Sequence, residues 1–104
     1  MNNAFGLSEQ DMDTLKSILS SYPEVDEAII FGSRSKGNYR NGSDVDIALK
    51  GLALNLDIVS QISYILNEET TMPYKFDILN YHTINNKELI DHINRLGISI
   101  YHSV

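Results

Sequence analysis

The stretch that decides how this chain folds is residues 29–47, IIFGSRSKGNYRNGSDVDI. It opens within an apolar strand of residues 28–31, which stops at the Gly-Ser pair of residues 32–33. A basic loop punctuated by glycines follows, and residues 44–47 (Asp-Val-Asp-Ile) re-enter a strand. The pattern predicts two strands whose connecting loop carries the polar chemistry of the protein.

Asp44 and Asp46 are two residues apart in the second of these strands. Side chains alternate between the two faces of a strand, so both carboxylates point the same way, with Cα atoms roughly 6.5–7 Å apart. Val45 and Ile47 point to the opposite face, which must be the core. Because neighbouring carboxylates repel each other, the arrangement favours a cation bound between them.

The loop before Asp44 suits a phosphate group. Gly32 permits close approach of the backbone, and the turn at Gly32-Ser33 offers amide groups and a hydroxyl as donors. No acidic residue occurs from 28 to 43, so the local charge is positive. The cations in that range are Arg34, Lys36 and Arg40. A phosphate cradle beside two carboxylates indicates metal-assisted phosphoryl chemistry on a small polyanion.

The spacing in this stretch is specific: Gly32-Ser33, ten residues, then Asp44-x-Asp46. Between them stand Gly37, Arg40 and Ser43. The pattern resembles the signature of the nucleotidyltransferase superfamily that includes DNA polymerase beta. The loop most resembles that of the minimal nucleotidyltransferases, short proteins usually paired with a HEPN-domain partner as a toxin–antitoxin system. At the level of element order the resemblance covers the whole chain.

The resemblance implies Mg²⁺-dependent transfer of AMP from ATP to a tyrosine hydroxyl of a HEPN toxin, with this chain as the antitoxin. Two Mg²⁺ ions would be held by Asp44, Asp46 and a third carboxylate on a following strand. Asp77 is the only acid placed for that role, either as a metal ligand or as the acceptor of the attacking hydroxyl's proton. The phosphates of ATP would be bound by Gly32, Ser33, Arg34, Lys36 and Arg40, and the sequence leaves open which cation reaches them. Tyr39 is the one tyrosine placed to touch a ligand.

The rest of the chain predicts a single domain, residues 1–104, of the α/β class, with about four helices around a small mixed sheet. Helices are expected over 8–22, 55–66 and 85–96, with a helical turn at 33–36. Their N-caps are Ser8, Asn55 or Asp57, and Asn85 or Asn86. Further strands are expected at 74–79 and 98–101. In the last helix the residues expected to face inward are Leu89, Ile90, Ile93 and Leu96.

Composition limits the setting and the partners. The chain has 8 basic and 14 acidic residues, a net charge of −6, so we expect no direct binding of nucleic acid, whose phosphates call for lysine and arginine. It contains no cysteine, which fits a reducing cytosol. We see neither a signal peptide nor an apolar run of the ~20 residues that a membrane span needs. The expected localisation is cytoplasmic.

Two other functions remain open. The protein could neutralise its partner by binding alone, or it could be a nucleotidyltransferase that acts on a small molecule. A hydroxyl-nucleophile enzyme has little support, because Ser33 has no histidine near it in sequence. None of the histidines forms a zinc-like spacing with another, and we expect His92 on the polar face of its helix.

Overall fold

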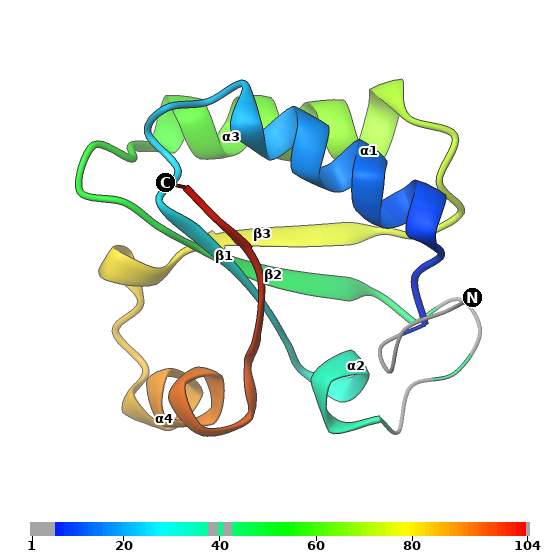
Figure 1. Ribbon diagram of the computed structural model, residues 1–104. Helices are drawn as coiled ribbons and strands as arrows, with labels where there is room; N and C mark the ends of the chain where they lie inside the picture. The colour runs from blue at the N-terminus through cyan, green and yellow to red at the C-terminus, as the bar shows by residue number, and fades with distance from the viewer. Residues whose placement is uncertain (1–5, 38–39, 41–42, 104) are drawn as a thin grey trace.

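The computed structural model describes residues 6–37, 40 and 43–103, which form a mixed sheet with helices on both faces (Figure 1). The Asn41-Gly42 turn and Tyr39 lie outside these residues. The helical elements in chain order are α1 (Glu9–Ser20), α2 (Ser33–Lys36), α3 (Leu56–Tyr64), the π-helical turn η1 (Ile65–Glu69), the 3₁₀ turn η2 (Tyr81–Thr83) and α4 (Lys87–Leu96). The strands are β1 (Glu27–Phe31), β2 (Val45–Lys50), β3 (Phe76–Asn80) and β4 (Ile98–His102).

The sheet has the strand order β3-β2-β1-β4. Strand β1 pairs antiparallel with β2 and with β4, whereas β2 and β3 are parallel. Helices α1 and α3 cover one face, α4 covers the other, and α2 stands at the end of β1 (Figure 1). The α/β class with four α-helices around a small mixed sheet is therefore confirmed for the described residues.

Side-chain caps explain where the longer helices begin. The Ser8 hydroxyl accepts the amide of Asp11 at 3.0 Å, and the Asp11 carboxylate accepts the amide of Ser8, which completes a capping box. Of the alternative caps, Asn55 begins α3 and Asn86 begins α4, each by accepting backbone N–H groups. Each cap satisfies donors that a helix start would otherwise leave unpaired.

Both faces of the sheet are buried, which explains why the central strands are apolar almost throughout. Leu15, Leu19, Ile30, Ile47 and Phe76 belong to the core beneath α1 and α3. The core beneath α4 is smaller and consists of Ile29, Phe31, Ala48 and Ile93. The inward orientation expected of Leu96 is wrong, since this side chain, in the last turn of α4, is 45% exposed.

Asn67 closes part of the outer edge of the sheet. From η1 its side-chain amide donates to the carbonyl of Phe76 at 2.9 Å and accepts the Phe76 amide at 2.8 Å. The side chain thereby occupies backbone groups that face away from β2, as a neighbouring strand would. Because Asp77 directly follows Phe76, Asn67 also fixes the backbone from which that carboxylate projects.

We expect Asn67→Ala to lower the free energy of unfolding by about 1–3 kcal/mol, because it leaves two backbone groups of the edge strand without their protein partner. Chemical denaturation measures the change. Asn94→Ala is the matched control, since it removes a single exposed contact with the Tyr81 hydroxyl. Equal stability of the two variants would contradict the role given to Asn67.

Candidate active site

Asp46 and Asp77 lie side by side on neighbouring strands. They are register partners in the parallel pairing of β2 with β3. Their strand neighbours Ala48 and Leu79 pack with the core beneath α4, so both carboxylates belong to that face of the sheet. Asp44 directly precedes β2, two residues before Asp46, and is exposed. Asp44, Asp46 and Asp77, here called the carboxylate cluster, thus lie at the same end of two parallel strands.

The pKa of Asp46 reflects its burial and the nearby carboxylates of Asp77 and Asp44. Burial raises the pKa of Asp46 from 3.8 to about 6, helped by repulsion from Asp77 and then Asp44 and by a hydrogen bond with Asp77. All these causes disfavour the ionised form of Asp46, so its negative charge costs free energy in the folded chain. A cation at the cluster would offset that cost.

The donor chemistry of the cluster fits Mg²⁺, a hard ion that prefers carboxylate oxygen and keeps several of its waters. In the part of the chain that the structure describes, no three Asp, Glu, His or Cys side chains already converge closely enough to hold a metal. Metal binding by Asp44, Asp46 and Asp77 therefore stays a prediction.

Gly32 lies directly against the cluster. Its φ of 78° and ψ of −151° are in a region that side chains other than glycine essentially never occupy. A Cβ placed on Gly32 would also collide with the Asp46 carboxylate oxygen Oδ2. The glycine expected of a phosphate cradle is thus required by its backbone conformation and by the approach of Asp46.

The helical turn predicted after Gly32 is present as α2. It ends at Gly37, whose φ of 82° reverses the chain. Ser33, the first residue of α2, is half-buried. The Gly-Ser turn and the carboxylate cluster therefore belong to one site, with Gly32 joining them.

The structure separates the cations of the loop. Arg34 is only 2% exposed and donates from Nε and Nη2 to the Ser43 carbonyl at 3.3 and 2.9 Å. Its guanidinium also lies over the Tyr74 ring, 4.9 Å from the centroid. Arg34 therefore holds the two ends of the loop together. Lys36 and Arg40 are exposed, so their side chains are better placed than that of Arg34 to reach a bound phosphate. Phosphate binding by any of the three stays a prediction.

The position of His92 differs from the one that the sequence predicts. The residue is half-buried, not on a solvated polar face, and its Nε2 accepts the amide of Gly32 at 2.9 Å. Its ring stands edge-on to Phe31, with centroids 6.1 Å apart. No signal in the sequence points to this contact, because 60 residues separate its two ends.

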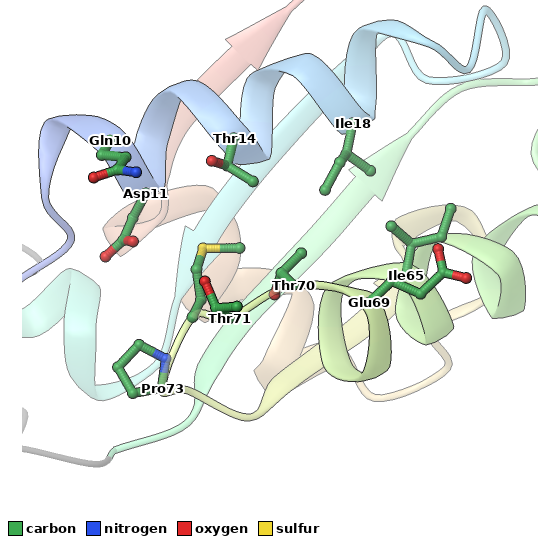
Figure 2. A pocket seen from close by; sticks show the side chains of 10 residues that line it. Gln10, Asp11, Thr14, Ile18, Ile65, Glu69, Thr70, Thr71 and Pro73 are labelled. Atoms are coloured by element: carbon green, nitrogen blue, oxygen red, sulfur yellow. The ribbon is translucent and has the colours of Figure 1, made fainter.

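A cavity of about 500 Å³ lies on the opposite side of the sheet, between α1 and η1 (Figure 2). In that view Ile18 of α1 lies across from Ile65 and Glu69 of η1, and Asp11 lies at the other end of the cavity, on the side of Pro73. None of the predicted site residues lines it.

Among the described helices, none has the length and apolarity that crossing a membrane requires.

Comparison with known proteins agrees with this geometry. The family described as "Polymerase beta, Nucleotidyltransferase" matches residues 13–103. No curated protein matches the chain. A chain of the crystal structure of a toxin–antitoxin with AMP-PNP superposes with a TM-score of 0.74 at 18% identity, over 89% of this chain and 74% of that one.

Two further structures extend the comparison. A chain of the tri-AMPylated Shewanella oneidensis HEPN toxin in complex with MNT antitoxin matches with a TM-score of 0.70 at 15% identity, over 93% of this chain and 74% of that one. A putative nucleotidyltransferase from Sulfolobus solfataricus has a TM-score of 0.53 at 19% identity, over 88% of this chain and 76% of that one. At these identities the likeness concerns the fold, whereas the family match spans nearly all of the sequence. The chain belongs to the polymerase beta nucleotidyltransferase family.

Proposed function

We propose that this protein is a metal-dependent nucleotidyltransferase that transfers AMP from ATP to a tyrosine hydroxyl of a HEPN-domain toxin, and so acts as an antitoxin. The observation that carries the proposal is the register pairing of Asp46 with Asp77, with Gly32 packed against Asp46. Family membership supports nucleotidyl transfer. The choice of acceptor is supported by the likeness in fold to chains of toxin–antitoxin structures, one of which contains an AMPylated HEPN toxin.

In this proposal the carboxylates serve the metal ions and the hydroxyl proton, and the loop serves the phosphates. Asp44 and Asp46 would hold up to two Mg²⁺ ions, which supply positive charge where negative charge develops at the phosphorus, and Asp77 would either ligate the second ion or accept the proton of the attacking hydroxyl. The Ser33 hydroxyl would donate to a phosphate oxygen, and the exposed Lys36 and Arg40 would neutralise the triphosphate. The Gly32 backbone would bring this turn close to the carboxylates.

The reaction is a displacement at the α-phosphorus. The tyrosine oxygen forms a bond to that phosphorus, the bond to the bridging oxygen of the β-phosphate breaks, and pyrophosphate leaves. In the proton-accepting alternative, Asp77 would take the hydroxyl proton, from a strand whose backbone Asn67 holds at Phe76.

Intact-mass spectrometry tests the proposal. The protein is mixed with ATP, Mg²⁺ and a purified HEPN-domain protein as its partner, and the HEPN protein should gain the mass of one or more AMP units. A HEPN protein of unchanged mass that is inhibited equally by wild type and by the Asp44→Asn/Asp46→Asn double variant would support inhibition by binding alone. Transfer to an aminoglycoside-like small molecule in place of the protein would support the other alternative.

We expect Asp77→Asn to separate chemistry from binding. If Asp77 accepts the proton, the rate of AMP transfer in a single turnover should fall about 10²-fold or more, while affinity for ATP changes much less. Rapid-quench measurement of the rate and calorimetric titration of ATP give the two numbers. An equal loss in both would make Asp77 a binding residue instead.

A further inference from the structure

The side chain of His92 links α4 to the loop that begins the site. Its Nε2 accepts the amide of Gly32 at 2.9 Å, and its ring packs edge-on against Phe31. The next residue, Ile93, is 2% exposed and belongs to the small core that also contains Phe31. The buried side chain of Ile93 therefore holds α4, and with it the imidazole of His92, against the sheet.

Both backbone polar groups of Gly32 are hydrogen-bonded, and its Cα lies close to a neighbouring side chain. Its amide is bound by His92, and its carbonyl accepts the Ser35 hydroxyl at 3.0 Å and the Lys36 amide at 3.2 Å. Its Cα faces the Asp46 carboxylate so closely that a Cβ would not fit. The N–H belongs to the peptide between Phe31 and Gly32 and the C=O to the peptide between Gly32 and Ser33, so rotation of either peptide would break one of these contacts. Together the contacts fix the backbone on both sides of Gly32, and Ser33 follows directly.

The N–H of Gly32 is therefore already used in the hydrogen bond to His92. A phosphate in the turn would have to use the Ser33 side chain and the amides that follow, whose direction depends on the Gly32 peptide. Glycine has no side chain to hold it in the unusual conformation observed here, so its backbone contacts must restrain it. The carbonyl is held from within α2, whereas the bond to the N–H comes from α4, outside the loop.

We propose that His92 is a positioning residue for the nucleotide site: by binding the Gly32 amide from α4, it fixes the Gly-Ser turn where the chain approaches Asp46. It acts through Gly32 and is not a catalytic residue. This inference rests on the proposed function for its ligand, a nucleoside triphosphate, whereas the hydrogen bond itself can be tested without any ligand.

Four variants separate positioning from packing. His92→Leu keeps an apolar side chain against Phe31 but removes the acceptor, and His92→Gln restores an acceptor oxygen. His82→Leu is the matched control, because His82 Nε2 accepts the amide of Gly51 at 3.1 Å, just after β2 ends and away from the carboxylate cluster. His92→Ala replaces His92→Leu should the leucine variant fail to fold.

The readouts are the Gly32 amide in a ¹⁵N-labelled sample and the affinity for Mg²⁺ with a non-hydrolysable ATP analogue. We expect a through-hydrogen-bond ¹⁵N–¹⁵N coupling between Gly32 and His92 in the wild type. His92→Leu should shift the Gly32 resonance and weaken binding about 5- to 10-fold, as expected for the loss of one hydrogen bond. His92→Gln should bind within about twofold of wild type, and so should His82→Leu.

The outcomes distinguish this inference from the proposed function. Failure of the wild type to bind the analogue would count against the proposed function while the coupling still tests the hydrogen bond. Absence of the coupling would overturn the inference directly. If the wild type binds, unchanged affinity in His92→Leu would overturn it, and so would equal weakening by His92→Leu and His92→Gln, since that indicates packing alone.

Discussion

Replacing Asp46 with asparagine should abolish nucleotidyl transfer and yet make the protein more stable at neutral pH in the absence of divalent ions. The substitution keeps the size of the side chain and removes the charge at the centre of the carboxylate cluster. Loss of several kcal/mol of transition-state stabilisation corresponds to a rate lower by roughly 10³-fold or more. Affinity for Mg²⁺ with ATP should fall in the same variant, which calorimetric titration measures.

The gain in stability follows from the raised pKa of Asp46. The folded chain holds the proton up to about pH 6, whereas the unfolded chain releases it near pH 3.8. As the pH rises from below 3.8 through 6, deprotonation therefore favours the unfolded state, and the stability of the wild type falls. Above pH 6 the full penalty applies, about 1–3 kcal/mol after allowance for the partial exposure of this carboxyl.

Asp46→Asn has no proton to release and should escape that penalty. Chemical denaturation in EDTA should find the variant about 1–3 kcal/mol more stable than wild type at pH 8 and nearly equal to it at pH 4. Asp26→Asn is the matched control, because it also removes one negative charge but lies exposed before β1, at the end remote from the cluster. A stability difference that does not vary with pH would contradict the account, as would unchanged Mg²⁺–ATP affinity in Asp46→Asn.

Much of the fold could be predicted because local signals and the core agree. Strand alternation placed Val45 and Ile47 in the core and Asp46 on the opposite face, and the structure confirms this assignment. Caps and glycines predicted where helices begin and end. The continuous apolar run of β1 is explained only by the fold, since both faces of the sheet are covered and Ile30 and Phe31 pack into different cores.

The sequence could not predict contacts between distant segments. Asp77 was singled out by resemblance to a family, since nothing local predicts that β3 pairs in parallel with β2. Arg34 looks like Lys36 and Arg40 in a list of charges, and it is distinguished only in the fold, by its burial, its hydrogen bonds to the Ser43 carbonyl and its contact with the Tyr74 ring. His92 meets Gly32 across 60 residues by the docking of α4. Periodicity shows which helical face is apolar, not what a single polar residue on its border will touch.

Gly32→Ala should have a comparably large effect, for two reasons that act together. The backbone conformation of Gly32 costs an alanine on the order of 1–3 kcal/mol before any contact is considered. The new methyl group would also collide with the Asp46 carboxylate. Either Asp46 or the Gly-Ser turn must then move, and a displacement of about 1 Å can reduce a catalytic rate by roughly 10²-fold.

Gly37 supplies the control, because it also has a positive φ, 82°, at the other end of α2. A Cβ at Gly37 would meet nothing within 4 Å, so Gly37→Ala carries the cost of the left-handed backbone without a collision. That variant should lose about 1 kcal/mol of stability and keep its affinity for ATP.

Gly32→Ala should lose more stability than Gly37→Ala, and it alone should lose nucleotide binding and AMP transfer. Denaturation, calorimetric titration and intact-mass spectrometry of the two variants in parallel give the comparison. Normal binding of ATP by folded Gly32→Ala would show that the turn does not have to approach Asp46, and the phosphate cradle would then lie elsewhere. Equal loss of binding in both variants would instead assign the effect to α2 as a whole, since the collision is present at Gly32 and absent at Gly37.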